Sequence, residues 1–417
     1  MKVVLAFISV AIGAGYPWPT LAAQPLPNEI YVWQRAWSAP VREAVAQHAA
    51  NFSETAVLMA EVTWKNKIPQ VTRVAVDFPT LEKISKPVGI VLRIGPYPGA
   101  LAANPMAVNF IVDLAAALSA EALTNKIGPA ELQIDFDCAE SKLDDYRAWL
   151  AILRNRLAPL PVRITALPNW LNSPAFAKLA AACPNYVLQV HSLNKPTDIN
   201  SPFALCDPVA AKIAVARAGE IGVPFRVALP TYGYLVAFDT AGKFIGISAE
   251  AARANWPSGT QLRELRADPV AIGSLVQFWN TNHPSALRGV IWYRLPVAVD
   301  NLNWRWPTLA AIMARREPCE NFRAVARRVE PGLVEISLDN IGDLDITSRL
   351  ALSVRWSDAH VSAGDGLRDF ELAEQENSVA KFQTKTSSFR LPAGEKQIVG
   401  WLRLDQDREV KLEVQKF

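Results

Sequence analysis

The sequence lacks several features that mark large classes of proteins. Its 43 basic and 40 acidic residues are interspersed and leave a net charge of only +3, so it has no electrostatic footprint of a nucleic-acid binder. Its four cysteines show no CxxC spacing, which argues against zinc and thiol redox chemistry. No GxGxxG follows any predicted strand, which removes the usual reason to expect a dinucleotide-binding sheet.

An apolar run opens the chain but is too short to cross a membrane. Lys2 is followed by the apolar run Val3–Ala14, and Pro17 and Pro19 interrupt what comes after it. A bilayer requires about 20 apolar residues, so a membrane anchor is the weaker alternative. We therefore predict a signal peptide over residues 1–23, a mature chain without a membrane span, and a periplasmic or secreted location.

Four cysteines would then lie in a compartment where disulfides can form. They are Cys138, Cys183, Cys206 and Cys319. If a bridge forms, we expect it between Cys183 and Cys206, which flank the sixth predicted strand. The full connectivity cannot be read from four cysteines.

Most of the chain alternates short apolar runs with stretches of helical period, which is the pattern of repeated βα units. Eight such units over residues 24–326 predict a (β/α)8 TIM barrel, and an open doubly wound sheet is the alternative. The expected strands are Ile30 to Trp37, Ala56 to Trp64, Gly89 to Gly95, Glu131 to Asp137, Val162 to Leu167, Tyr186 to Ser192, Phe225 to Tyr232 and Gly289 to Leu295. Expected helices include Met106 to Leu123, Leu143 to Leu157, Ser173 to Ala182, Pro208 to Gly219 and Asp268 to Trp279.

The pattern of apolar and polar residues changes after Pro318. Long stretches of helical period are followed by short alternating segments separated by Gly, Asp and Asn. We expect a small antiparallel β-sandwich over residues 327–417. Its expected strands lie within Val329 to Leu338, Leu350 to Trp356, Phe382 to Leu391, Gln397 to Leu404 and Val410 to Val414.

The fourth predicted strand carries polar residues at every second position. Alternation places Gln133, Asp135 and Asp137 toward the barrel interior. Asp137 stands at the C-terminal edge, where the active sites of these barrels lie. Asp135 is one step deeper, so a structural or pKa-tuning role is as plausible for it as direct chemistry.

The same alternation points further polar and aromatic side chains into the barrel, although the register of each strand can slip by one. These residues are Glu61 and Thr63 on the second strand, Arg93 on the third, Gln189 and His191 on the sixth, Tyr232 on the seventh, and Trp292 with Arg294 on the eighth. Arg93 lies between Glu61 and Asp135 in strand order. A structural ion-pair network is therefore the alternative to substrate binding for these three.

Histidine and tryptophan add two weaker signals. His191 is either a metal ligand or general base, or a histidine hydrogen-bonded inside the barrel. Five tryptophans fall at or after predicted strand ends, where they would either stack on sugar rings or pack in the core. They are Trp64, Trp170, Trp292, Trp304 and Trp306.

The run Leu132-Gln133-Ile134-Asp135-Phe136-Asp137 resembles the strand-four signature of family 18 glycoside hydrolases, the chitinase-like enzymes. The resemblance places Asp137 at the position of the terminal glutamate acid, and Gln133 and Asp135 at two aspartate positions. It implies that Trp292 floors a sugar subsite and that Tyr232 stands near the acetamido group. Two departures put substrate-assisted chitin cleavage in doubt, because Gln133 replaces an aspartate and Asp137 is one methylene shorter than the expected acid.

Most of the predicted barrel resembles a bacterial family catalogued as Domain of Unknown Function 3142. The resemblance includes Gln133 to Asp137, Tyr146 in the following helix, and the run from Ile164 to Trp170. It implies an exported barrel protein and no particular substrate.

These observations lead to one leading hypothesis and two rivals. The leading one is a glycoside hydrolase acting on a polysaccharide or oligosaccharide, with Asp137 as general acid and Asp135 tuning it. Glu61, Glu140 or the substrate's own acetamido group remain candidates for the second catalytic group. The rivals are a non-catalytic glycan-binding protein and, ranked last, a metal-dependent hydrolase using Asp135, Asp137 and His191. We predict no cofactor and no resident metal.

Overall fold

Eight parallel strands close into a barrel in the computed structural model, which describes residues 25–192, 195–248, 256–376 and 378–417. The strands follow the order β1-β12-β8-β7-β6-β5-β4-β2, and the pairing of β1 with β2 closes the circle. Their bounds are β1 Asn28–Val32, β2 Thr55–Lys65, β4 Val88–Ile94, β5 Leu132–Phe136, β6 Val162–Ala166, β7 Tyr186–Gln189, β8 Phe225–Pro230 and β12 Leu287–Tyr293. The predicted (β/α)8 barrel is confirmed, and the alternative of an open sheet is excluded.

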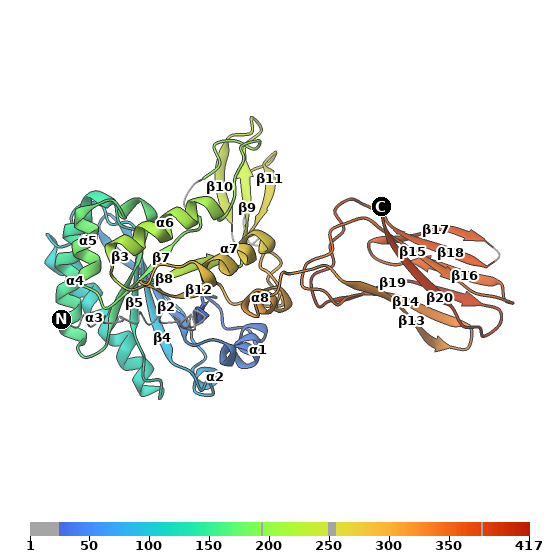
Figure 1. The fold of residues 1–417 in the computed structure, drawn as a ribbon, viewed down its shortest axis with the longest axis horizontal. Helices are drawn as coiled ribbons and strands as arrows, with labels where there is room; N and C mark the ends of the chain where they lie inside the picture. Colours follow the sequence, from blue (N-terminus) through green and yellow to red (C-terminus); the bar gives the residue numbers. More distant parts are fainter. Residues whose placement is uncertain (1–24, 193–194, 249–255, 377) are drawn as a thin grey trace, which may run out of the picture.

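Helices cover the outside of the barrel (Figure 1). They are α1 Ala39–His48, α2 Phe78–Leu81, α3 Pro105–Thr124, α4 Leu143–Leu157, α5 Pro174–Ala181, α6 Pro208–Ile221, α7 Pro269–Thr281 and α8 Trp306–Met313, with short 3-10 turns at Ala49–Asn51, Glu140–Lys142 (η2) and Pro168–Trp170. Proline stands in the first turn of α3, α6 and α7, where a missing N–H costs nothing. The preceding Asn104, Asp207 and Asp268 accept hydrogen bonds from the first-turn amides and so fix where these helices begin.

Helix α3 is long and apolar enough to cross a membrane by length and composition alone. In the barrel it lies in the outer layer, and residues along its length such as Val108, Ile111 and Leu118 are buried. Its buried residues form the face that packs against the barrel strands.

Two additions to the barrel were not predicted. Strand β3 (Ile68–Arg73) pairs antiparallel with the end of β2 and extends it past the barrel rim. Strands β9 (Gly233–Phe238), β10 (Phe244–Ser248) and β11 (Gln261–Arg266) form a separate three-stranded sheet between β8 and α7, which projects from the barrel in Figure 1. Both additions stand at the C-terminal end of a barrel strand, so they extend the walls of the mouth.

The C-terminal unit is a sandwich of two four-stranded antiparallel sheets, ordered β13-β14-β19-β16 and β17-β18-β15-β20. The strands are β13 Phe322–Glu330, β14 Leu333–Asn340, β15 Leu350–Arg355, β16 Val361–Gly366, β17 Phe370–Glu376, β18 Val379–Thr384, β19 Lys396–Leu404 and β20 Lys411–Lys416. The segment expected from Val329 to Leu338 is two strands, because the chain turns at Gly332, whose φ of 73° suits a residue without a side chain. Strands β16 and β17 were missed because their exposed faces are too polar to show a core pattern.

The predicted disulfide between Cys183 and Cys206 is absent, because both residues are buried free thiols. They lie beyond opposite ends of β7, which has four residues. At about 3.3 Å per residue, this strand holds them farther apart than the roughly 7 Å that a disulfide tolerates. The predicted signal peptide, residues 1–23, lies outside the described residues.

A buried group of charges fills the end of the barrel opposite the mouth. Arg226, with a side chain that is 3% exposed, contacts Glu29 and lies 2.8 Å from Oε1 of the fully buried Glu131. Arg163 contacts Glu131 and lies 4.0 Å from Glu54. Paired charges at this depth specify how the strands meet, because each charge left unpaired would be strongly destabilising.

Glu54 within this group should make stability depend on pH. Burial, and then the charge of Glu29, raise the pKa of Glu54 above its ordinary value of 4.5, against the opposing effect of the two arginines. The stability that this group contributes is then fully present below pH 4.5 and is lost as the pH rises through the raised pKa. We expect Glu54→Gln, which cannot ionise, to gain Tm relative to the wild-type protein between about pH 4 and about pH 8. A difference in Tm that is the same at both pH values would show that Glu54 does not titrate in this range.

Candidate functional site

Three acids and two arginines meet at the C-terminal mouth of the barrel. Glu61, Arg93 and Asp135 stand side by side on β2, β4 and β5, as the strand register pairs them. Arg93 reaches both aspartates, with Nε 3.8 Å from Oδ2 of Asp135 and Nη2 3.2 Å from Oδ2 of Asp137. Glu61 is instead paired with Arg35, Nη2 to Oε2 at 2.6 Å.

The expected network of Glu61, Arg93 and Asp135 is therefore corrected. Its first member pairs elsewhere, because Arg35, in the segment after β1, supplies a closer cation. Arg93 instead pairs with Asp135 and Asp137, which both stand at the end of β5. Burial works against the charge of Arg93, but the attraction of Asp135 and Asp137 outweighs it and raises the arginine's pKa.

The two aspartates have different environments. The side chain of Asp135 is 17% exposed and accepts a hydrogen bond from the Thr165 hydroxyl at 2.7 Å. Burial raises the pKa of Asp135, although Arg93 and the bond from Thr165 act in the opposite direction. The side chain of Asp137 is 44% exposed, directly after β5. Asp137 is thus open to a ligand, while Asp135 lies behind it.

Gln133 lies deeper in the barrel, as the alternation of β5 predicts. It has no exposed surface, and its Oε1 accepts a hydrogen bond from the Tyr31 hydroxyl at 2.6 Å. Through this hydrogen bond Gln133 fixes the position of the Tyr31 hydroxyl inside the barrel. Its predicted role in substrate binding stays a prediction.

An aromatic cluster stands at the mouth. Tyr293, the last residue of β12, contacts the rings of Tyr31, Trp33, His191 and Tyr232 at centroid distances of 5.9, 5.0, 5.5 and 5.1 Å. Burial raises the pKa of Tyr293, so its hydroxyl stays protonated at neutral pH. The cluster forms an aromatic wall of the mouth, in which Tyr293 is partly exposed and the four rings that it contacts are buried.

The hydroxyls of this wall form a chain. The Tyr232 hydroxyl lies 3.2 Å from Nδ1 of His191 and 2.9 Å from the Tyr234 hydroxyl, which lies 2.9 Å from the Ser192 hydroxyl. Burial lowers the pKa of His191 to about 3, so this histidine is neutral at ordinary pH. Gln189 fixes the backbone beside it, since its Nε2 donates to the His191 carbonyl at 3.1 Å. His191 and Tyr232 therefore meet at the mouth as predicted, in a hydrogen-bonded arrangement.

Trp292 does not point into the barrel, and the expectation that it does is wrong. Its ring is fully buried, packs 6.1 Å from Trp304, and donates from Nε1 to Oδ1 of Asn28 at 2.9 Å. The register of β12 differs by one residue from the expected one, so Tyr293 faces inward. Trp170 and Trp304 are also buried, 1% and 5% exposed, and belong to the core. Of the five tryptophans, Trp64 and Trp306 keep partial exposure.

The register of β12 determines which aromatic residue faces the mouth, and two variants test it. Tyr293→Ala should raise the Kd for a ligand bound in the mouth by roughly fivefold, since a lost ring contact is worth about 1 kcal/mol. Trp292→Phe should lower Tm and leave that Kd unchanged, because the indole lies outside the mouth. Titration calorimetry on both variants measures the two effects. If Trp292→Phe raised the Kd and Tyr293→Ala left it unchanged, Trp292 and not Tyr293 would be the residue that faces the mouth.

Within the described residues, no group of three His, Cys, Asp or Glu side chains is arranged to hold a metal ion. Asp135, Asp137 and His191 accordingly do not form a ligand set there. The sequence reasoning also missed Tyr31, Arg35, Thr165 and Tyr293. Strand alternation alone could have found Tyr31 and Thr165, but Arg35 lies outside the regular strands.

The closed strands and the acids at their C-terminal ends define a (β/α)8 barrel with a candidate site at its mouth. The chain belongs to the family described as a domain of unknown function, DUF3142, whose model matches residues 85–298, just over half of the chain. Residues 323–405 match a second domain of unknown function, DUF8456. No curated protein matches this chain.

Several solved structures share the fold. The spore cortex-lytic enzyme SleL of Bacillus cereus is 11% identical over 70% of this chain and 74% of its own, with a TM-score of 0.51. SleL of Bacillus megaterium is 12% identical over 72% and 75%, with a TM-score of 0.50. The C-terminal domain of a putative chitinase from Desulfitobacterium hafniense is 11% identical over 69% and 98%, with a TM-score of 0.50. At these identities the likeness is one of fold.

Proposed function

We propose that this protein is an exported glycoside hydrolase that cleaves a polysaccharide or oligosaccharide at the barrel mouth, with Asp137 as general acid. The observation that carries the proposal is the pair of acids at the end of β5. Asp137 is exposed to a ligand, Asp135 is shielded behind it, and Arg93 contacts both. Acids in contrasting environments are the usual basis for dividing catalytic roles between carboxyl groups.

Asp135 acts on Asp137 in this proposal. It is held by the Thr165 hydroxyl and by Arg93, so its carboxyl group has a fixed position below the rim. From this position Asp135 orients Asp137 through Arg93, which contacts both carboxyl groups. Arg93 contacts Oδ2 of Asp137, so Oδ1 is the oxygen that approaches the glycosidic oxygen in this proposal.

Glu61 is the favoured second catalytic group. Strand β4 lies between β2 and β5, and Asp137 stands two residues beyond the register level of Glu61. With about 4.8 Å between strands and about 3.3 Å per residue, the backbones that carry Glu61 and Asp137 are roughly 12 Å apart, and their side chains extend toward each other across the mouth. Such a separation suits the wider carboxyl spacing of inverting enzymes, about 6.5 to 9.5 Å, which leaves room for a water molecule. Glu140, exposed in the turn η2 after β5, and the substrate's acetamido group remain the alternatives.

The aromatic wall supports a glycan as the substrate. Tyr293 is the partly exposed ring of the wall and stands on the side of the mouth away from β5, and the buried rings of Trp33 and Tyr232 support it from behind. Two proteins of similar fold are named spore cortex-lytic enzymes and a third a putative chitinase. The export of this chain rests on the apolar N-terminal run and places the activity in the periplasm or outside the cell.

A second candidate function is non-catalytic glycan binding on the same barrel. It is favoured by the arginine partners of all three mouth acids, Arg35 on Glu61 and Arg93 on the two aspartates. Carboxylates held in ion pairs can brace a site without taking part in chemistry. In that case the aromatic wall would provide the affinity.

A glycan array followed by product analysis separates the two candidates. Purified mature protein is screened for binding, and each bound glycan is then incubated with it and tested for new reducing ends. Release of product from at least one bound glycan supports hydrolysis. Binding without product from any of them would reject the hydrolase and leave the binding protein.

A further inference from the structure

The loop after β12 connects the mouth to α8 and carries the last aromatic residue of the wall at its start. Arg294 follows Tyr293 directly, and its side chain is paired with Asp300 farther along the loop. The backbone of Thr231, at the end of β8, accepts a hydrogen bond from Trp304 N at 2.7 Å. Thr231 in turn holds the start of the loop, because its amide donates to the Tyr293 carbonyl at 2.7 Å and its hydroxyl accepts the Arg294 amide at 2.9 Å. The loop and Tyr293 are therefore connected through Thr231.

Arg305 holds the loop from inside. The residue is 7% exposed. Its Nη1 donates to the backbone carbonyls of Val297 at 3.3 Å, Ala298 at 2.6 Å and Asp300 at 3.2 Å. One guanidinium nitrogen thus holds three carbonyls within residues 297–300 of the loop, and charge-assisted bonds of this kind are stronger than neutral ones.

Two side chains of the C-terminal sandwich reach the same loop. Arg390 donates from Nη1 to the carbonyl of Asn301 at 2.9 Å, and Glu395 lies 2.9 Å from Nη2 of Arg305. Arg390 is itself fixed by Asp345, which accepts its Nε at 2.8 Å and also accepts the amide of Ala393 at 2.9 Å. Both contacts come from the short segment 390–395, which precedes β19.

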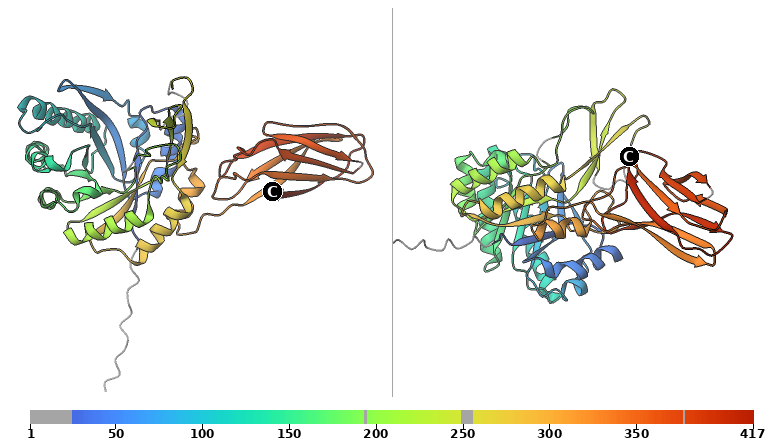
Figure 2. Two further views of the ribbon diagram at one scale, coloured as in Figure 1. Left: turned by 90° about the horizontal axis from the view of Figure 1, so that it is seen from above. Right: turned by 45° about the vertical axis from the view of Figure 1, so that its right-hand side comes forward.

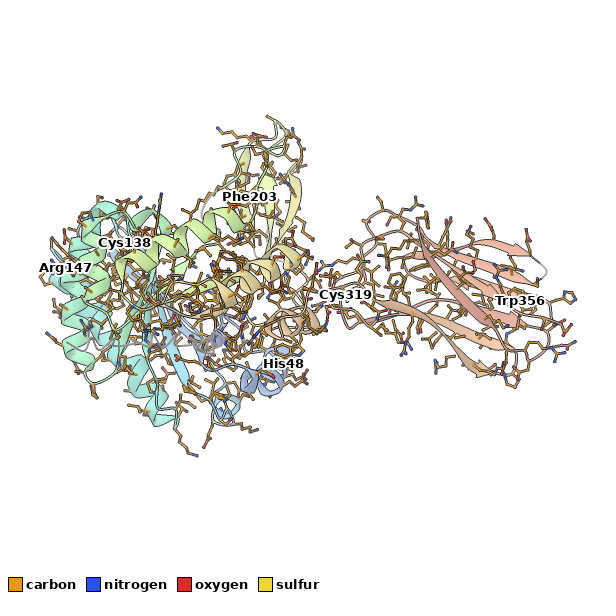
Figure 3. All side chains as sticks on the ribbon, in the orientation of Figure 1. His48, Cys138, Arg147, Phe203, Cys319 and Trp356 are labelled. Carbon is orange, nitrogen blue, oxygen red and sulfur yellow. The ribbon has the colours of Figure 1, made fainter. Side chains whose placement is uncertain are left out.

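The junction of the two units has further polar contacts. Asp343 of the sandwich forms a two-pronged ion pair with Arg316 at 3.0 and 3.1 Å, and its carbonyl accepts the Thr308 hydroxyl of α8 at 2.5 Å. Figure 3 labels Cys319 in the connection between the units and His48 on the barrel side of it. The other views in Figure 2 show the sandwich attached at this one end of the barrel. These contacts fix the sandwich against the barrel, and so they fix segment 390–395 next to the loop after β12.

We propose that the C-terminal sandwich is a positioning element of the mouth, acting through Arg390 and Glu395 on the loop 294–305. The two residues do not touch the substrate. They fix the loop, the loop fixes Arg294 and Tyr293, and Tyr293 forms the wall that a sugar contacts. That the sandwich fixes the loop does not depend on the proposed function. Only the expected effect on glycan binding rests on the proposed function.

Hydrogen exchange on the full chain tests the structural part. Glu395→Gln removes one charge with little change in shape, and Arg390→Ala removes the bond to Asn301. In both variants the protected amides of the loop, those of Leu295, Asp300, Leu302 and Trp304, should exchange roughly tenfold faster. Arg390→Lys should restore part of the protection, because it keeps a cation within reach of Asn301.

Arg327→Ala is the matched control. Arg327 lies in the sandwich and forms an exposed pair with Glu335 at 2.9 Å, away from the junction. Its loss should leave exchange in the loop unchanged. Unchanged exchange in the loop of both Glu395→Gln and Arg390→Ala would overturn the proposal, and Glu395→Gln keeps this test valid if Arg390→Ala unfolds the sandwich.

Glycan binding supplies the second readout. If the mouth binds glycan, Glu395→Gln and Arg390→Ala should raise the Kd or KM several-fold while kcat changes less, and Arg390→Lys should recover part of the loss. If Arg390 and Glu395 only stabilised the fold, their substitution would lower Tm without raising KM more than it changes kcat. Faster loop exchange with no turnover in any variant, wild type included, would reject the hydrolase and leave the positioning role intact.

Discussion

Replacing Asp137 by Asn is expected to lower kcat/KM for the glycan substrate by roughly 10²- to 10⁴-fold, the usual contribution of a general acid. The amide has the shape of the carboxyl group but no proton to give to the leaving oxygen. Because the Arg93–Asp137 pair is 37% and 44% exposed, its loss should change the free energy of unfolding by less than about 1 kcal/mol. Glycan binding should persist. Initial rates and calorimetric titration on the same preparation separate the two effects.

Asp144→Asn is the control for this prediction. Asp144 lies in the first turn of α4, its side chain is 64% exposed, and it pairs with Arg147 at 3.5 Å. The same change of charge at this position should leave both turnover and affinity unaltered. Full activity in Asp137→Asn would remove Asp137 from the mechanism, and equal losses in both variants would point to a general effect of charge.

Replacing Glu131 by Ala is expected to lower the free energy of unfolding of the barrel by about 3–5 kcal/mol. The Glu131 side chain has no exposed surface and lies between Arg163 and Arg226. Its removal leaves two guanidinium groups in the barrel interior with one fewer carboxylate between them. Water cannot compensate for the missing partner at that depth. Urea denaturation followed by tryptophan fluorescence measures the change.

Glu82→Ala provides the comparison at the barrel surface. Glu82 pairs with Lys126 at 2.9 Å, and the two side chains are 48% and 76% exposed. Loss of this pair should cost less than about 1 kcal/mol, because solvent screens it. If Glu131→Ala proved no more destabilising than Glu82→Ala, the charges opposite the mouth would not be stabilising the barrel as a network.

The alternation of side chains along the strands predicted most of the residues at the mouth that lie on regular strands. The run from Leu132 to Asp137 alternates without interruption, so its inward face could be read directly, and Gln133, Asp135 and Asp137 lie as expected. Arg93 is the one charged residue of the otherwise apolar β4, so a position toward the polar interior of the barrel could be expected for it. Regular strands buried between helices and a closed interior leave little freedom of register.

Two kinds of feature could not be read in this way. On β12, Ile291, Trp292 and Tyr293 are all apolar or aromatic, so alternation could not tell inside from outside, and the assignment was off by one. The partner of Glu61 could not be found because Arg35 reaches it from a segment outside the regular strands, where no periodicity applies. Contacts between the barrel and the sandwich depend on tertiary packing in the same way.

A crystal structure of the Asp137→Asn variant with a bound oligosaccharide tests the central claim most directly. The ligand would be a glycan that the array identifies, and the substitution prevents its turnover. We predict a glycosidic oxygen within about 3.2 Å of the side chain at position 137 and a sugar ring against Tyr293. An oligosaccharide bound elsewhere, on the sandwich or on the outer helices with the mouth empty, would contradict the account.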